Sequence, residues 1–464
     1  MKHRLKNKSR AQRSEVERSS TPFKYMKSEI LQKARGVRDY GPSEAIMRNK
    51  IIDILRSTFE LFGYNPIETP IIERYELFAS KYGIGEESDA MRETFKLKDQ
   101  GDRKIVLRTE FTVPFARFVG MNQDIKLPFK RYQLGSVFRD GPIKLGRYRE
   151  FWQCDVDSVG ISSAKVDGEL LQLANNVFKK LGIDVVIKIN NRKILNAFMD
   201  YVGIEYNKQK SVIITLDKLD KLGEKVIKEE LLAKDISRDK INKLIDLINI
   251  SGDNSELIDK LQNIIGECDG LSEIKEAIDC VYDNENILFS PSLARGLAYY
   301  TGNVFEVFLT DNTLLSSSIA GGGRYDDMIG GLIGNNQNYP AVGLSFGLDT
   351  IFDAMKLSNK DILLKKNITD VYIIPLGTNF YSEIIKLTNT LRTNDINVDV
   401  DYLGRKLKKA MEYVNDYQIP FVLIIGEDEI KNKQFTIKNM FTGDQEMCPL
   451  EKVINIIKEY KKRV

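Results

Sequence analysis

The chain has 464 residues, of which 42% are hydrophobic and 29% charged, and its formal net charge is +3 at pH 7. That length can supply two or three domains with large cores, and no apolar run predicts a membrane span or a secretory signal. The four cysteines show no C-x-x-C spacing and the one histidine, His3, lies in a polar segment. We therefore expect no disulfide framework, no histidine-ligated zinc site and no histidine-based nucleophile, and the cysteine usage suits a reducing cytoplasm.

The N-terminal segment, residues 1–25, is polar and basic and is predicted to be disordered. Residues 1–24 hold eight Lys or Arg and two Glu, which leaves a net charge of −3 for the rest of the chain. The plain interpretation is a solvated tail, and the alternative is an arm that attracts RNA without sequence specificity. Overall charge gives no argument for a nucleic-acid partner, so such a partner would have to bind local basic patches.

The first regular elements follow this tail. Residues 46–62 have apolar positions at helical spacing, and Gly63 ends the predicted helix. Residues 64–73 read Y-N-P-I-E-T-P-I-I-E, and two prolines in a β-like run predict an edge strand or a subunit contact.

Residues 104–121 are predicted to form a strand that turns into a helix. Thr109 or Thr112 is the expected N-cap, and Pro114 fits the first helical turn. Glu110 stands at the end of the strand among mostly apolar neighbours. On its own it is read as a helix cap or a surface carboxylate.

Residues 137–160 are predicted to form an antiparallel hairpin around a loop that contains Gly and Pro. This stretch combines three arginines with three carboxylates: Arg139, Arg147, Arg149, Asp140, Asp155 and Asp157. One face of its second strand carries only polar side chains: Gln153, Asp155 and Asp157. A half-solvated outer strand is one interpretation. The density of arginines, whose planar fork suits phosphate and carboxylate, favours a pocket for an anionic ligand.

After the hairpin, residues 162–355 alternate between helical and strand-like patterns. Residues 162–181 predict an amphipathic helix and residues 185–190 a strand, whereas residues 196–286 are rich in Lys, Glu, Ile and Leu and predict an inserted helical subdomain. Strand character returns at residues 293–309. The glycine-rich run at 319–328 matches neither G-x-G-x-x-G nor a P-loop, so its glycines are interpreted as sites of close backbone approach. A strand passing into a helix is expected at residues 341–355.

A polar, lysine-rich linker is expected at residues 356–367, and residues 368–464 are predicted to form a separate α/β domain. Its elements alternate in order: strand 371–375, helix 381–391, strand 398–401, helix 406–416, strand 421–426, strand 434–439 and helix 450–460.

Three motifs together resemble the histidyl-tRNA synthetase family of class II aminoacyl-tRNA synthetases. They are the arginine-rich hairpin, R-G-L-A-Y-Y-T-G at residues 295–302 and A-G-G-G-R-Y-D at residues 320–326. The resemblance covers about residues 34–460. It includes L-G-R-K-L-K-K-A and V-L-I-I-G-E-D-E in the C-terminal block, which are similar to the family's anticodon-binding domain.

The resemblance implies an α+β fold. Residues 26–355 would form a catalytic domain, an antiparallel sheet flanked by helices, with the helical insertion at about 196–286. After the linker, residues 368–464 would form the α/β anticodon-binding domain. Residues 64–73 resemble motif 1, which builds a homodimer interface, and the hairpin and residues 341–355 resemble motifs 2 and 3.

The resemblance also implies the activity. The chain would activate L-histidine with ATP to histidyl-adenylate, with Mg²⁺ carried by ATP and no protein-only metal site, and would then transfer histidine to tRNA(His) in the cytoplasm. No side-chain nucleophile is required for either in-line step, and catalysis would consist of positioning and charge stabilisation.

The matched positions imply roles for single residues. Glu110, Thr112 and Gln153 would hold the α-ammonium of histidine. Asp157 and Tyr300 would each bind one imidazole nitrogen. The implied catalytic residues, at the histidine carboxylate and the α-phosphate of ATP, are Arg139 and Arg295. The implied ATP-binding residues are Arg139 and Arg147. The full histidine-binding set is Glu110, Phe111, Thr112, Arg139, Gln153, Asp157, Arg295, Tyr299, Tyr300 and Tyr325.

The chain departs from the family pattern at three places. Thr350 stands where motif 3 has an arginine for the ATP γ-phosphate, Ala298 stands where an Asp is frequent, and Asp140 directly follows Arg139. Another basic residue is expected to replace the missing charge. Two alternatives stay open: a non-catalytic synthetase-like regulatory subunit of ATP phosphoribosyltransferase, and a synthetase-derived tRNA-binding sensor. Without the resemblance, the sequence predicts a multidomain α+β protein with an Arg/Asp-lined pocket for an anionic ligand.

Overall fold

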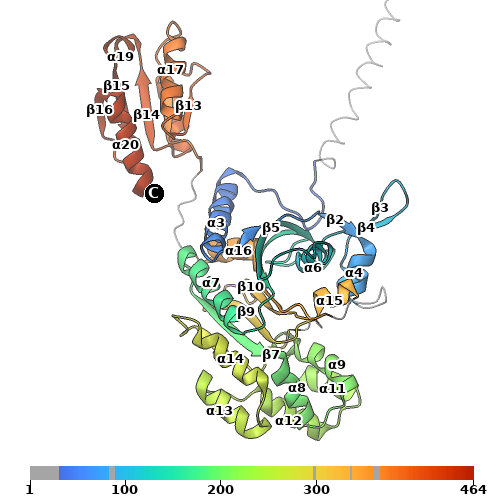
Figure 1. Cartoon of the computed structure of the whole chain (residues 1–464). Coiled ribbons are helices and arrows are strands. Elements are labelled where there is room, and N and C mark those ends of the chain that lie inside the picture. Colours follow the sequence, from blue (N-terminus) through green and yellow to red (C-terminus); the bar gives the residue numbers. More distant parts are fainter. Residues whose placement is uncertain (1–30, 83–88, 296–298, 335–336, 359–365, 464) are drawn as a thin grey trace, which may run out of the picture. The chain divides into compact units, whose positions relative to one another are not determined.

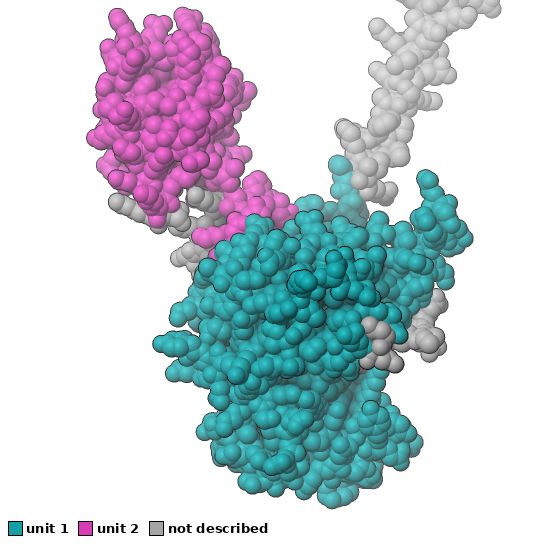
Figure 2. Space-filling model, in the orientation of Figure 1, with its two compact units in different colours: residues 1–39, 55–357 teal, residues 40–54, 358–464 magenta. Residues whose placement is uncertain are grey.

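The computed structural model describes residues 31–82, 89–295, 299–334, 337–358 and 366–463 (Figure 1). It divides into two compact units, one of residues 1–39 and 55–357 and one of residues 40–54 and 358–464 (Figure 2). The predicted basic tail at 1–25, Ala298 and most of the predicted linker lie outside the described residues. Within the described ranges, no helix combines the length and the apolar character needed to cross a membrane.

The first unit is built on an eight-stranded sheet in the order β1-β5-β6-β11-β10-β9-β7-β8. Only the outer pairs β1–β5 and β7–β8 are parallel. The strands are β1 (Asn65–Pro66), β5 (Phe129–Phe138), β6 (Glu150–Val159), β7 (Val185–Asn191), β8 (Ile287–Phe289), β9 (Asn303–Leu309), β10 (Ala320–Arg324) and β11 (Ala341–Gly347). The proline-bearing β1 lies at an edge, as its sequence predicts. The hairpin forms as expected, with β5 and β6 antiparallel over ten residue pairs.

One face of this sheet is apolar and covered by helices. Phe346 on β11 contacts Phe59 of α3 (Pro42–Leu61) and Phe178 of α7 (Lys165–Leu181), with ring centroids 5.5 and 5.8 Å apart. Helix α3 begins four residues before the predicted start because Pro42 suits the first helical position. The apolar face of β6 therefore lies on the core, and its polar face is left for a pocket.

A smaller sheet stands beside the main one, in the order β2-β4-β3. It and its neighbouring helices comprise β2 (Ile72–Arg74), α4 (Tyr75–Tyr82), α5 (Asp89–Arg92), β3 (Lys96–Lys98), β4 (Lys104–Leu107), α6 (Thr112–Met121) and α15 (Met328–Ile333). Fully buried Phe78, Val106 and Phe115 join these elements in one apolar cluster. This cluster anchors the start of α6, where Glu110 stands.

The Lys/Glu/Ile/Leu-rich region forms helices, as predicted (green to yellow in Figure 1). They are α8 (Arg192–Tyr201), α9 (Tyr206–Leu216), α10 (Leu219–Leu222), α11 (Glu224–Leu232), α12 (Arg238–Ile248), α13 (Asn254–Ile265) and α14 (Asp269–Asp279). Asn191 and Asp253 cap α8 and α13 by accepting backbone N–H bonds. The helices lie between β7 and β8 in the sequence, so they are an insertion into the sheet connectivity.

The second unit has its own five-stranded sheet, β13-β12-β14-β15-β16. Its elements are β12 (Val371–Pro375), α17 (Tyr381–Arg392), β13 (Val398–Val400), α18 (Leu407–Asp416), β14 (Phe421–Ile425), α19 (Glu427–Asn432), β15 (Gln434–Asn439), β16 (Gln445–Pro449) and α20 (Leu450–Arg463). The sequence did not predict α19 or β16. The first has only six residues, and the second is a mostly exposed edge strand that lacks an apolar alternation. In the first unit, α16 (Leu348–Leu357) follows β11 as predicted.

Candidate active site

The polar face of the main sheet consists of three rows that cross β5, β6 and β11. The residues of each row stand opposite one another in register: Arg131, Asp157 and Gly343; Gln133, Asp155 and Ser345; Gly135, Gln153 and Gly347. Because β6 lies between two strands, its polar face is not at an edge. Asp155 and Asp157 are only 4% and 3% exposed. The interpretation of a half-solvated outer strand is therefore wrong, because the protein encloses both carboxylates.

Asp157 is held from two sides. Its Oδ2 lies 2.6 Å from Nη2 of Arg131, in an ion pair that lacks aligned hydrogen-bond geometry. Its Oδ1 accepts a hydrogen bond of 2.5 Å from the Tyr325 hydroxyl. Burial raises the pKa of Asp157, and the Arg131 guanidinium opposes that rise. The guanidinium itself is fully buried and lies 4.3 Å from the Phe115 ring centroid, so the orientation of the carboxylate is fixed by packed neighbours.

Glycines bring these side chains close to the backbone of the sheet. A β-carbon on Gly343 would lie 1.9 Å from Oδ1 of Asp157. On β10, β-carbons on Gly321 and Gly323 would lie 2.4 Å from Nη1 of Arg295 and 2.8 Å from the Tyr300 ring. The glycine-rich run thus serves close approach, as the sequence indicates, and the approaching groups are site side chains.

Arg295 lies over β9 and β10. Its guanidinium donates to the carbonyl of Phe305 over 3.3 Å, and its Nε lies 3.6 Å from Glu306. The cation stands 5.5 Å from the Tyr300 ring centroid. Tyr300 contacts Tyr299 at 4.7 Å between centroids, and a perpendicular contact joins Tyr299 to Tyr325 at 6.3 Å. The three tyrosines therefore connect Arg295 to Asp157.

Glu110 caps helix α6. Its carboxylate accepts the backbone N–H groups of Thr112 and Val113 over 2.7 and 2.9 Å, and no threonine side chain caps the helix. The expected cap at Thr109 or Thr112 is therefore wrong. The two oxygens of the Glu110 carboxylate reach two of the unpaired backbone N–H groups of the first turn, which a single hydroxyl oxygen does not. The Glu110 charge also raises the pKa of Asp155 and Asp157, which shows that the three carboxylates lie near one another.

Phe111 occupies the N-cap position itself and is fully buried. Its ring lies 4.6 Å from the guanidinium carbon of Arg108 and borders Gly135, which stands opposite Gln153. Gln153 donates from Nε2 to Ser345 Oγ over 2.9 Å. Its carbonyl oxygen is buried and has no hydrogen-bond partner among the described residues.

The loop between β5 and β6 carries the remaining arginines. Arg139 donates to the carbonyl of Thr109 over 3.1 Å, so it stands beside the Glu110 segment. Arg147 is exposed, and its backbone forms a tight turn with Lys144. A β-carbon on Gly146, within that turn, would lie 3.5 Å from the methyl of Thr350 at the start of α16. The loop tip and Thr350 are therefore neighbours.

Sequence reasoning missed several residues of the site: Arg131, Gln133, Ser345, Glu306 and Arg38. Arg131 and Gln133 alternate with apolar Tyr132 and Leu134 along β5, so the period-two pattern that identified β6 could have found them. Arg38 lies 3.1 Å from Asp349 and 2.9 Å from Asp353 on α16, an arrangement that no local pattern predicts.

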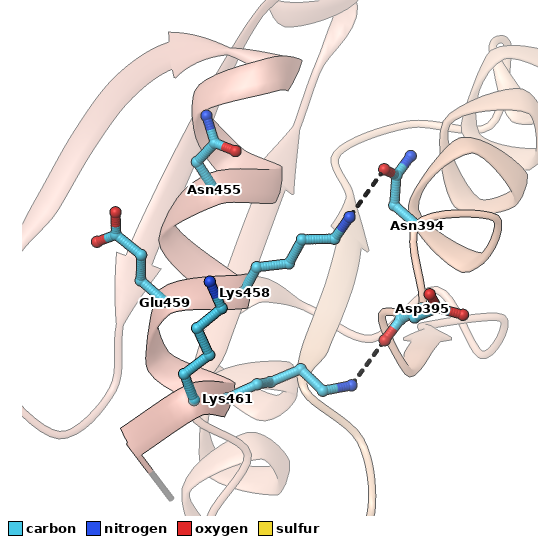
Figure 3. A pocket seen from close by; sticks show the side chains of 7 residues that line it. Asn394, Asp395, Asn455, Lys458, Glu459 and Lys461 are labelled. Atoms are coloured by element: carbon cyan, nitrogen blue, oxygen red, sulfur yellow. Dashed lines mark hydrogen bonds between the residues drawn. The ribbon is translucent and has the colours of Figure 1, made fainter.

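Other ionic groups belong elsewhere. Arg324, which precedes Tyr325 in the sequence, pairs with buried Asp167 and is structural. A pocket of about 310 Å³ lies in the second unit between α20 and the loop that follows α17 (Figure 3). Two of its lysines are engaged locally, since Lys458 donates to Asn394 and Lys461 to the carbonyl of Asp395. This pocket contains none of the candidate residues. In the described part of the chain, no three His, Cys, Asp or Glu side chains gather as a metal site.

Comparisons with known proteins agree with this geometry. The family model described as histidyl-tRNA synthetase matches residues 36–351, and the anticodon binding domain model matches residues 370–460. The chain is 40% identical over 432 residues to a Bacillus cereus protein named "Histidine--tRNA ligase 1", and the match covers 92% of this chain and 100% of the relative.

Two solved structures have similar folds. The histidyl-tRNA synthetase from Nostoc sp. PCC 7120 matches with a TM-score of 0.81 and 29% identity, over 94% of this chain and 99% of that one. A Bacillus halodurans C structure titled as an ATP phosphoribosyltransferase regulatory subunit/histidyl-tRNA synthetase matches with a TM-score of 0.70 and 24% identity, over 85% and 98% of the two chains. The second likeness concerns the fold alone.

Proposed function

The chain belongs to the histidyl-tRNA synthetase family, and from this premise we propose that the pocket on the polar face of β6, β10 and β11 binds L-histidine and forms histidyl-adenylate. The chain is a histidine–tRNA ligase, which uses ATP to attach histidine to tRNA. The observation that carries the site assignment is the buried Asp157, which Arg131 and Tyr325 hold in a fixed orientation on the same face of β6 as an unpartnered Gln153 oxygen.

Histidine recognition follows from the chemistry of these groups. Asp157 is an acceptor for one imidazole N–H, and Tyr300 is the group for the other ring nitrogen. Glu110, Thr112 and the Gln153 carbonyl oxygen supply acceptors for the α-ammonium. A site of this kind rejects amino acids that lack the ring nitrogens, because its buried polar groups would then be left unpaired.

Adenylate formation needs cations along the phosphates. Arg295 and Arg139 would bind the histidine carboxylate and the α-phosphate, where negative charge grows as the carboxylate oxygen attacks phosphorus and pyrophosphate leaves. The fixed position of Arg295 between Glu306 and Tyr300 supports this role. Transfer to tRNA then exchanges the adenylate for an ester at the 3′-terminal adenosine, and neither step needs a protein nucleophile.

The charge missing at Thr350 would come from the loop between β5 and β6. Arg147 and Lys144 stand at its tip, both exposed, and Gly146 between them borders Thr350. A threonine leaves room for this loop where an arginine would compete for the same space. We assign Arg147 to the terminal phosphates of ATP.

The proposal also covers the metal ion, the oligomeric state, the location in the cell and the domain limits. Mg²⁺ would arrive bound to the phosphates of ATP. The edge strand β1 and residues 64–73 would pair two copies in a homodimer. The protein would work in the cytoplasm, where the four cysteines, free in the structure, stay reduced. Domain limits at 26–355 and 368–464 are supported by the family matches and by the division near residue 357.

The alternatives are disfavoured. A regulatory subunit has no need of a complete histidine site, and a curated relative that is matched over its whole length is named as a ligase. The test is ATP–pyrophosphate exchange with purified full-length protein. Exchange that depends on histidine, and not on other amino acids, is expected. Histidine binding without any exchange would overturn the adenylation site and leave a sensor.

A further inference from the structure

We propose that Asp155 is a positioning residue, which acts through Ser345 to keep the carbonyl oxygen of Gln153 turned toward the α-ammonium of the bound amino acid. No role in histidine binding is assigned to Asp155 or Ser345 above. The inference rests on the proposed function of the pocket and deepens it, because it explains how one neutral side chain comes to select a cation.

Three residues form the connection. Ser345 on β11 stands directly opposite Asp155 on β6, and its hydroxyl lies close enough to that carboxylate to lower its pKa. The Nε2 atom of Gln153 donates to Ser345 Oγ over 2.9 Å. Gln153 Oε1 is buried and has no partner in the described ranges. The direction of donation therefore runs from Gln153 to Ser345 to Asp155.

The proton count of a hydroxyl makes this direction obligatory. An ionised carboxylate can only accept hydrogen bonds, so the Ser345 hydroxyl must donate its single proton to Asp155. Its oxygen can then only accept a further bond, and the Gln153 NH₂ group is the donor in reach. The amide is thereby fixed with its carbonyl oxygen turned away from Ser345, where it is unpartnered and can accept from an ammonium group. Rotation of the amide would put its carbonyl oxygen against the Ser345 oxygen, which has no proton left to donate, and its NH₂ group against the ligand cation.

The charged groups around Asp155 set its protonation state, which determines whether Ser345 donates its hydrogen bond to Asp155. Arg131 and Gln133 face it from β5, Asp157 lies on its own strand, and Glu110 and Arg108 approach from the segment before α6, with Tyr325 beyond Asp157. Burial raises the pKa of Asp155 to about 7, while Arg131 and Ser345 counteract the rise. A protonated Asp155 can donate to Ser345, which frees the serine proton for Gln153 Oε1 and removes the preference for a cation.

The test compares two ligands that differ only in the ammonium group. Histidinol carries it, and 3-(imidazol-4-yl)propan-1-ol does not. For the full-length protein at pH 8, we expect Asp155→Asn and Ser345→Ala each to reduce the affinity ratio of the two ligands by about ten- to one-hundredfold, the range for one hydrogen bond to a charged group. The affinity for the second ligand should change little, whereas a general collapse of the pocket would weaken both.

Two controls separate the connection from simpler effects. The double variant should lose no more than the larger single loss if Asp155 acts through Ser345, and the losses should multiply if Asp155 acts only by its charge. Ser158→Ala, a buried serine on the opposite face of β6, should leave the ratio unchanged. Between pH 8 and pH 6 the wild-type ratio should also fall further than the ratio in Asp155→Asn. The imidazoles of the two ligands titrate differently, because only histidinol has a neighbouring ammonium group, and this contribution is the same in both proteins.

The outcomes distinguish this inference from the function on which it rests. If the wild-type protein binds histidinol and Asp155→Asn keeps the full preference, the positioning role is wrong and the histidine pocket stands. If the wild-type protein binds neither ligand, the proposed pocket itself is wrong.

Discussion

The carboxylate of Asp157 rests directly on the backbone of Gly343, because a β-carbon at that glycine would lie only 1.9 Å from Oδ1. Gly343 stands opposite Asp157 in the β6–β11 register. The neighbouring strand β10 is glycine-rich for the same reason, with Arg295 and Tyr300 lying on Gly321 and Gly323. The glycines, which have no side chains, therefore determine the depth of the pocket as much as the side chains that line it.

Gly343→Ala is accordingly expected to displace the imidazole-binding carboxylate. We predict that the KM for histidine in pyrophosphate exchange rises by at least about a hundredfold, by analogy with misplacing a reacting group by about 1 Å, while the KM for ATP changes much less. Gly331→Ala is the matched control, since a β-carbon there meets open space within a helix. A histidine KM that stays at the wild-type value in Gly343→Ala would contradict the position assigned to Asp157.

Tyr325→Phe and Asp157→Asn test the same carboxylate from two directions. Loss of the tyrosine hydroxyl leaves Oδ1 without its donor, and we expect the histidine KM to rise about tenfold with little effect on ATP. Asp157→Asn removes the partner of a fully buried arginine, so it should also lower the free energy of unfolding by about 3–5 kcal/mol. Denaturant unfolding beside the kinetics separates these effects. Equal losses for histidine and ATP in both variants would argue against the imidazole assignment.

The sequence predicted this pocket only in part, for identifiable reasons. Period-two alternation located the polar face of β6, because strand periodicity is local. The partner of Asp157 is Arg131 on β5, which stands 26 positions earlier, and only the strand register brings the two together. Glu110 was difficult for another reason, since one carboxylate serves both as helix cap and as candidate ligand. Reasoning from the sequence treated the helix-cap role and the ligand-binding role of Glu110 as alternatives, whereas the geometry allows Glu110 to have both roles.

Composition and resemblance predicted the long elements of the fold more readily than the short ones. The helical insertion and the alternating C-terminal elements are long and periodic. In contrast, α19 and β16 are short, and their formation depends on Glu429 bonding to the N-cap backbone and on pairing with β15. The contacts of Arg38 with α16 join residues more than 300 positions apart, and no local pattern carries that information.

Arg295→Ala is predicted to abolish adenylate formation while leaving the fold intact. The loss of one fixed cation at the developing charge should cost about 3–4 kcal/mol in the activation step, or roughly a thousandfold in exchange rate. Arg295→Lys should recover only a small part, because an ammonium lacks the planar fork. Circular dichroism and the melting temperature check the fold. An exchange rate near that of the wild type in Arg295→Ala would eliminate the assigned role.

Arg147→Ala is predicted to raise the KM for ATP by about tenfold, since the loop tip would lose its contact to the terminal phosphates. Lys144→Ala is the comparison within the same turn and should have the smaller effect. Addition of Thr350→Arg to Arg147→Ala should restore part of the ATP affinity, because the smaller side chain at the loop tip leaves space for a cation on α16. If Arg147→Ala leaves the ATP KM unchanged, the replacement of the missing charge has to be sought at another basic residue.

The buried Asp155 should make stability depend on pH in a defined direction. Its pKa is about 7 in the folded protein against 3.8 for an ordinary aspartate, so between these values the unfolded chain has released a proton that the folded protein retains. The contribution of this group to the free energy of unfolding is therefore complete below pH 3.8 and falls as the pH rises to 7, by up to about 4 kcal/mol. Asp155→Asn lacks this titration, so its stability relative to the wild type should rise from pH 4 to pH 7 and level off above. Urea unfolding at several pH values measures the difference, and Asp102→Asn at an exposed turn is the control. A difference that is independent of pH would mean that Asp155 titrates alike in the folded and unfolded states.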